Sequence, residues 1–165
     1  MRHWINLTEN YTPSPFDEFF HASSTPLEIG TTLEYRGGSG MDMQIEEILE
    51  RYRPADCRNR KCVYVVTDIR ALDTVVAHYE HLYVVDPQSE LERYDAVWLN
   101  RIWSGLAMQD NGTEFTPDEE AKWANGYWSG QPCPREHGEQ VAWEFLCDSA
   151  IVVEEIEGEG TDDDW

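Results

Sequence analysis

The chain has 165 residues, of which 41% are hydrophobic and 12% aromatic, so it is long and apolar enough to bury a core. Its 33 acidic residues against 12 Lys and Arg give a formal charge of −21 at pH 7. A surface this negative argues against direct binding to nucleic acid or anionic membranes and leaves a basic protein partner open. Without an apolar run of roughly 20 residues or a signal-like start, we expect a cytoplasmic protein with no membrane contact.

We expect one domain over residues 1–157, because no repeat or linker divides the chain, and an acidic disordered tail over 158–165. Residues 154–165 include seven acids, so the rest of the chain still has a formal charge of −14. The four cysteines are expected to be free thiols, and the spacing of Cys57 and Cys62 is too loose to predict a zinc site.

Hydrophobic periodicity and turn residues predict interleaved helices and strands after an aromatic, Pro-containing first segment. In the first half we expect a strand over 27–36, an amphipathic helix over 43–50, a buried strand over 62–67, and a helix over 70–80 capped by Asp68. In the second half we expect a strand over 81–86, helices over 94–103 and from Thr116 onward, and two closing strands. The irregular spacing favours an α+β fold over regular parallel βαβ units.

One acidic residue, Glu144, stands within the apolar segment Trp143-Glu144-Phe145-Leu146-Cys147. A carboxylate among strand-forming apolar residues is costly to bury, so we expect it to face solvent or a cleft in which its charge is used. Two earlier predicted strands end in Arg36 and Thr67. These side chains are the expected partners of Glu144 in such a cleft.

In order and spacing, three segments resemble the motifs of the ADP-ribosyltransferase superfamily, in the branch with an Arg, a Ser or Thr, and a Glu on successive core strands. The segments are 33–36, 63–68 and 143–146, and the resemblance covers about residues 27–156. It implies a split β-sandwich with flanking helices. It also implies an enzyme that transfers a single ADP-ribose from NAD to a macromolecule, most simply a protein target, in a phage, toxin or defence effector.

The resemblance implies a role for each residue of these motifs. Glu144 would stabilise the oxocarbenium-like state that forms as the nicotinamide–ribose bond breaks. Arg36 would bind the NAD pyrophosphate, with Gly37 allowing close approach to the backbone, and Thr67 would orient the ribose or Glu144. The aromatic residue that stacks on nicotinamide is left open among Tyr35, Tyr64, Tyr83 and Trp128. No metal is expected.

Two features depart from the family pattern. Branches that modify Arg or Asn on proteins have a Gln or Glu two residues before the catalytic Glu, where this chain has Ala142. Glu139 is therefore the candidate group that activates the acceptor, and the acceptor residue stays open. Thr67 stands alone where the family has a Ser-Thr-Ser triplet.

A second class of function remains open beside the transferase. The many carboxylates suit an acidic, DNA-mimicking inhibitor that blocks a nucleic-acid-binding protein by occupancy, or an inactive protein with the transferase fold. Structural interpretations also exist for the motif residues: a surface cation for Arg36, a turn and helix cap for Thr67, and an edge-strand charge for Glu144. Among the five histidines, only His21 is a candidate cleft residue.

Overall fold

The computed structural model describes residues 9–14, 16–35, 43–75, 79–136 and 139–156. The described part has the expected α+β architecture, in which helices and strands alternate irregularly along the chain. The strands are β1 (Phe19–Ser23), β2 (Thr32–Leu33), β3 (Val63–Val65), β4 (His81–Pro87), β5 (Glu92–Asp95), β6 (Trp143–Cys147) and β7 (Ala150–Glu155). The helices are α1 (Met43–Tyr52), α2 (Leu72–Val75, directly after the 3-10 turn Ile69–Ala71), α3 (Val97–Asp110) and α4 (Pro117–Trp128).

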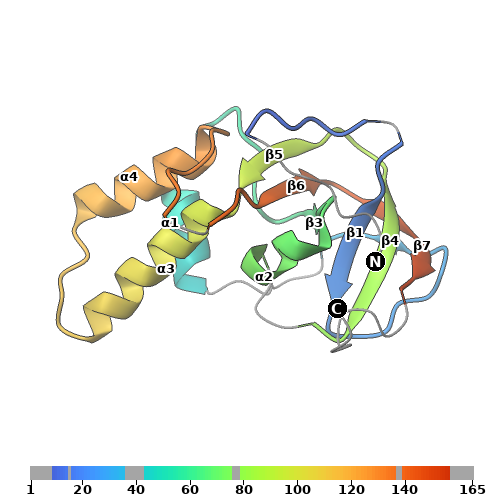
Figure 1. Cartoon of the computed structure of the whole chain (residues 1–165), viewed down its shortest axis with the longest axis horizontal. Coiled ribbons are helices and arrows are strands. Elements are labelled where there is room, and N and C mark those ends of the chain that lie inside the picture. Colours follow the sequence, from blue (N-terminus) through green and yellow to red (C-terminus); the bar gives the residue numbers. More distant parts are fainter. Residues whose placement is uncertain (1–8, 15, 36–42, 76–78, 137–138, 157–165) are drawn as a thin grey trace.

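The strands form two antiparallel sheets, with the orders β1-β4-β7-β2 and β3-β6-β5. The sheets meet where Phe20 of β1 pairs with Val66, the residue after β3. Their two backbone N–H···O hydrogen bonds measure 2.7 and 3.0 Å. The strands therefore follow one another from β2 to β5 as one curled surface, with β1 and β3 at the joint (Figure 1).

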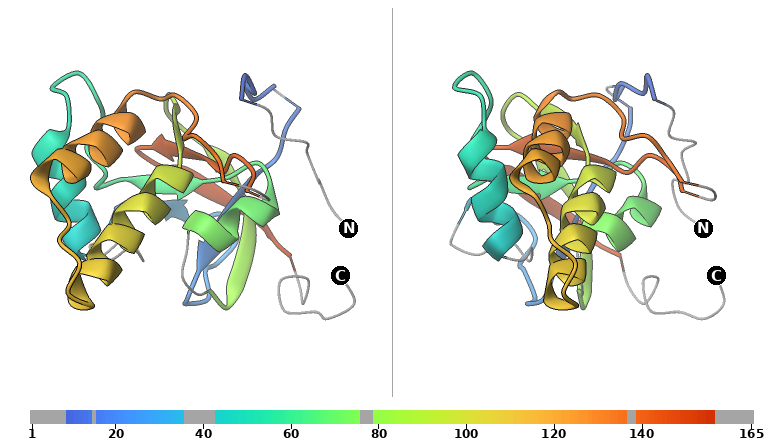
Figure 2. Two further views of the ribbon diagram at one scale, coloured as in Figure 1. Left: turned by 60° about the vertical axis from the view of Figure 1, so that its left-hand side comes forward. Right: turned by 90° about the vertical axis from the view of Figure 1, so that its left-hand side faces the viewer.

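Side chains alternate along each strand and divide the core into two clusters on opposite faces of the curled sheet. We call one face the helix side, where Val66 and Leu146 pack with residues of all four helices. The other is the loop side, where Val65 and Phe145 pack with half-buried residues from loops and sheet edges. Figures 1 and 2 show α1, α3 and α4 gathered at one end of the molecule, with α3 and α4 forming a helical hairpin.

Several predicted elements are confirmed, and their local signals explain them. Helix α1, strand β4, helix α4 and the two closing strands lie where they were expected. Helix α4 begins with a capping box, in which the Thr116 hydroxyl accepts a hydrogen bond from the Glu119 N–H and the Glu119 carboxylate accepts one from the Thr116 N–H. Asp68 accepts a hydrogen bond from the Arg70 N–H at 2.9 Å, as expected of a cap, although the turn that it caps is a 3-10 turn.

Four predictions about elements or their bounds were wrong, and strand pairing between distant segments explains most of them. Strand β1 lies in the aromatic first segment, where no strand was predicted, and it pairs with β4. Of the expected strand over 27–36, the described residues 27–35 form only β2, at the edge of its sheet. Residues 92–95 form β5 against β6, so the helix expected from residue 94 begins at Val97 and continues to Asp110. Of the helix expected over 70–80, α2 spans one turn, and residues 76–78 lie outside the described part.

Candidate functional site

Glu144 lies on the helix side of β6 and is fully buried, with no exposed surface. Its Oε1 accepts hydrogen bonds from Arg60 Nη1 at 2.7 Å and from the Tyr127 hydroxyl of α4 at 2.5 Å. Its Oε2 has no hydrogen-bond partner among the described residues. The expectation that Glu144 faces solvent or a cleft was therefore wrong, because a buried cation and a buried hydroxyl compensate its charge.

Arg60 is the centre of a buried polar cluster, which also contains Glu46, Tyr64, Tyr127 and Glu144. Arg60 Nε donates to Glu46 Oε1 of α1 at 2.7 Å, and its guanidinium stacks against the rings of Tyr64 and Tyr127, 4.9 and 5.2 Å from their centroids. Burial alone would lower the pKa of Arg60, but the surrounding acidic groups outweigh it and hold the pKa well above the usual value. Arg60 is therefore a permanent cation that joins two helices to two strands.

Glu46 forms the solvent end of this cluster, with a side chain that is 25% exposed. Burial raises its pKa above the usual value, although the nearby Arg60 acts in the opposite direction, and the negative charge of Glu144 adds to the rise. Two carboxylates thus share one guanidinium. We interpret the cluster as a structural device, because each of its named side chains contacts another member and Arg60, Tyr127 and Glu144 are buried.

Thr67 is also fully buried, but on the loop side. Its hydroxyl lies next to that of Tyr11, and the Tyr11 ring packs edge-on against Phe145 at a centroid distance of 6.3 Å. In β6, Phe145 and Glu144 point to opposite faces because strand side chains alternate. The expected contact between Thr67 and Glu144 is therefore not formed.

The segment that was expected to present Arg36 follows β2, at the far edge of its sheet from β3 and β6. Arg36 and Gly37 themselves lie outside the described residues, so their predicted roles are not placed. Tyr35 comes after the end of β2 and is 39% exposed. On the side of β3 away from β6, the neighbouring strand is β1 and not the strand that was expected to end in Arg36.

The other aromatic candidates are structural residues in this arrangement. The Tyr64 hydroxyl donates to the Arg60 carbonyl on the helix side, and Trp128 Nε1 donates to the Leu49 carbonyl at 2.8 Å. Tyr83 is fully buried on the loop side, where its hydroxyl accepts a hydrogen bond from the Leu27 N–H at 2.7 Å. These three rings lie on two different faces of the sheet, so they do not form one stacking surface.

Glu139, the candidate acceptor-activating group, pairs with Arg101 of α3 at 2.6 Å. The hydrogen bond from Arg101 lowers the pKa of the Glu139 carboxyl. A carboxylate held ionised by a guanidinium is a weak proton acceptor, so the geometry does not favour its use as a general base.

His21 lies at the joint of the two sheets, on the loop side of β1, opposite Tyr83 in the register. Its Nδ1 is 2.9 Å from the Tyr64 carbonyl oxygen. Because a carbonyl only accepts, Nδ1 must hold the proton, which makes Nε2 an acceptor. Burial lowers the pKa of His21 despite that hydrogen bond, so the ring is neutral at pH 7. The strand-forming aromatic pair Phe19-Phe20, followed by the turn residues Ser23 and Ser24, was the sequence signal that could have identified this strand.

A separate open pocket of about 380 Å³ lies where the loop after α1 meets the ends of β5 and β6. Arg58 in its wall pairs with Glu92 and Asp148. Its lining residues are Asp56, Cys57, Arg58, Asn59, Lys61, Glu92 and Asp148. The pocket includes none of the predicted catalytic residues.

All four cysteines are free thiols. Among the described residues, no group of His, Cys, Asp and Glu side chains is arranged to hold a metal ion. Within the same ranges, no helix has the length and apolar character needed to cross a bilayer. No protein-family model matches the chain, and no curated protein matches it in sequence.

Proposed function

We propose that the chain is an NAD-dependent mono-ADP-ribosyltransferase that modifies a macromolecular target, most simply a protein. The fold supports this proposal at the level of architecture. Two antiparallel sheets meet where β1 pairs with the end of β3, and β3 and β6, which hold two of the three motif segments, are neighbours in one of these sheets. The split β-sandwich that the resemblance implies would have this kind of division.

The observation on which the proposal depends is the position of His21. It is a neutral, half-buried histidine on the strand that joins the two sheets, and the Tyr64 carbonyl orients its ring. Its acceptor nitrogen is suited to bind a ribose hydroxyl of NAD. We place the ligand site on the loop side, where His21 and Thr67 lie, because helices cover the other face.

The proposal does not place Glu144 in contact with NAD. The buried carboxylate accepts hydrogen bonds from Arg60 and Tyr127, so its removal would first lower the stability of the fold. A developing ribosyl cation still needs nearby negative charge, and the diphosphate of NAD itself brings such charge close to the reacting carbon. Arg36 remains the proposed cation for that diphosphate, on the strength of the resemblance.

The test compares two histidine variants. His21→Leu should weaken NAD binding by about tenfold or more, because it removes a positioned hydrogen-bond partner. His81→Leu is the matched control, since His81 lies on the neighbouring strand β4 and pairs with Glu155 at the surface. Calorimetry would give NAD affinity and release of nicotinamide would give turnover, with thermal unfolding to verify the fold. If the full chain neither binds NAD nor releases nicotinamide with basic proteins supplied as acceptors, the proposal fails.

One observation favours the second candidate, an acidic inhibitor that occupies a nucleic-acid-binding protein. The carboxylate that the resemblance makes catalytic has no access to solvent, while the chain as a whole has a charge of −21. If the chain is an inhibitor of this kind, the wild type and His21→Leu should bind the partner with equal affinity. A transferase would lose its activity in that variant.

A further inference from the structure

The helical hairpin formed by α3 and α4 is packed closely along its own interface. A Cβ added at Gly105 of α3 would lie 2.5 Å from the ring of Phe115, and one added at Gly126 of α4 would lie 2.4 Å from the ring of Trp98. Such contacts leave no space for a Cβ at these positions, so the Trp98 ring of α3 packs directly on the backbone of α4 at Gly126, and the ring of Phe115, in the connecting loop, packs on α3 at Gly105. The hairpin is therefore a firm platform for its outward-facing residues.

The second half of α3 exposes apolar side chains on this platform. Trp103 is 60% exposed and Met108 is 53% exposed, while Leu106 and Ala107 between them are half-buried. Residues 102–109 include no charged side chain. Trp103 and Met108 are five positions apart, so they lie on the two margins of the exposed face of α3, about 140° apart around the helix axis. Single exposed apolar residues need no explanation, but Trp is among the residues that contribute most to binding at protein interfaces.

Acidic side chains follow this apolar segment in the chain, at the end of α3, in the connecting loop and in the first turn of α4. Four are exposed and form no ion pair with any described residue: Asp110, Glu114, Asp118 and Glu119. The cations of the hairpin are otherwise engaged, because Arg101 pairs with Glu139 and Lys122 lies over the ring of Trp123 at 4.6 Å. The apolar segment is thus bordered by negative charge without local compensation.

We propose that Trp103, Leu106, Ala107 and Met108, with the four neighbouring acids, form a docking surface for a basic protein. The partner would insert an apolar side chain beside Trp103 and place Lys or Arg residues against the acids. A second copy of this chain does not fit, because it would bring the same negative charges face to face. Nucleic acid and anionic membranes are repelled for the same reason. The inference needs no NAD chemistry, so it stands or fails apart from the proposed function.

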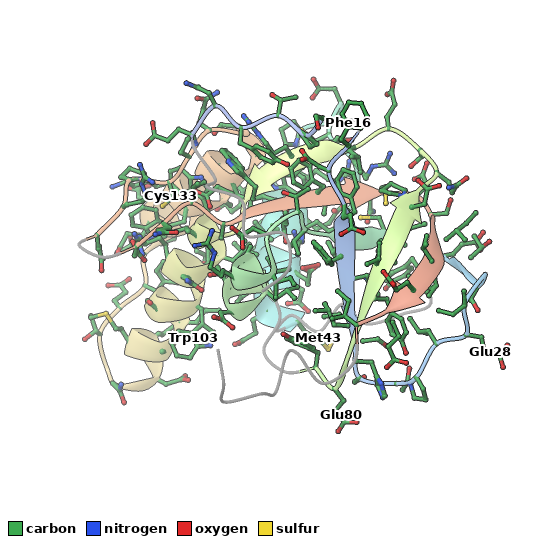
Figure 3. The ribbon with its side chains drawn as sticks, turned by 45° about the vertical axis from the view of Figure 1, so that its right-hand side comes forward. Phe16, Glu28, Met43, Glu80, Trp103 and Cys133 are labelled. Carbon is green, nitrogen blue, oxygen red and sulfur yellow. The ribbon has the colours of Figure 1, made fainter. Side chains whose placement is uncertain are left out.

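The test uses a defined probe, a fluorescently labelled synthetic amphipathic helix of leucine and lysine, and measures its affinity by anisotropy. Trp103→Ala should weaken binding by about tenfold, as expected for a central aromatic contact. Phe16→Ala is the matched control, because Phe16 is 94% exposed and lies on the opposite side of the molecule (Figure 3). It should leave the affinity unchanged. Alanine favours helix, so Trp103→Ala should retain the fold.

A second pair of variants separates local charge from total charge. Asp110→Asn with Asp118→Asn removes two charges from the hairpin without disturbing the Thr116–Glu119 capping box. Glu28→Gln with Glu80→Gln removes two charges away from the hairpin, Glu28 at the other end of the molecule and Glu80 at its lower edge (Figure 3). Only the two substitutions in the hairpin should weaken binding of the probe and reduce the salt dependence of that binding. Equal losses for both pairs, equal losses for Trp103→Ala and Phe16→Ala, or no measurable binding by the wild type would each overturn the proposal.

Discussion

The two faces of the curled sheet are covered in different ways, and among the described residues only the helix side encloses a charged cluster built around a buried cation. The helix side has helices over it and encloses a cluster in which Arg60 joins Glu46, Glu144 and Tyr127. The loop side has half-buried residues of loops and sheet edges over it, and His21 is among the side chains there. The buried charges of the first face hold elements together, whereas on the second face His21 is half-buried and Thr67 is fully buried.

The largest expected effect is the loss of Arg60. Arg60→Met would leave the carboxylates of Glu46 and Glu144 without their cation, so we expect the free energy of unfolding to fall by about 3–5 kcal/mol. Urea denaturation measures the change. The control is Arg51→Met, which breaks an exposed pair with Glu120 and should cost less than about 1 kcal/mol. Similar losses for the two variants would contradict a structural role for the cluster.

Glu144→Gln should reduce the loss caused by Arg60→Met when the two changes are combined, because it removes one of the uncompensated charges. Any fall in NAD affinity in Glu144→Gln should follow the fraction unfolded. A folded variant that binds NAD normally but has lost turnover would instead return Glu144 to a catalytic role.

A smaller effect compares one tyrosine hydroxyl on each face. Tyr127→Phe removes the buried donor to Glu144 and should cost about 1–3 kcal/mol, because a carboxylate with no exposed surface loses one of its hydrogen bonds. Tyr11→Phe removes the half-buried donor to Asp17 and should cost about 1 kcal/mol or less, because water can reach that carboxylate. Thermal unfolding of both variants checks the order, and a larger cost for Tyr11→Phe would reverse the comparison.

The smallest effect is a pH dependence from Glu46. Its pKa in the folded state is raised by burial, so the folded protein binds this proton more tightly than the unfolded chain does. The contribution of Glu46 to stability is therefore fully present below its unfolded pKa of about 4.3 and is lost as pH rises through the folded pKa. The stability of wild type relative to Glu46→Gln should fall from pH 4 to pH 7. A rise over that interval would mean that the attraction of Arg60 outweighs burial.

Part of the fold could be predicted because its signals are local. The amphipathic spacing of α1, the Thr116–Glu119 capping box and the apolar run of β4 each depend on residues close in sequence. The arrangement of the candidate site could not be predicted in this way, because it depends on which face of the sheet each side chain occupies. Alternation along β6 required Glu144 and Phe145 to point to opposite faces, but nothing in that segment decides which face is the helix side.

The sequence by itself determined an acidic chain with an α+β pattern of helices and strands. Only the tertiary structure decided that β1 lies beside β3 and that Glu144 pairs with Arg60, which is 84 positions earlier in the chain. Both outcomes are contacts between distant segments. The physical reason is that a buried carboxylate is stable wherever a cation can be brought to it, and the position of that cation is set by packing of α1, α4 and the sheet together.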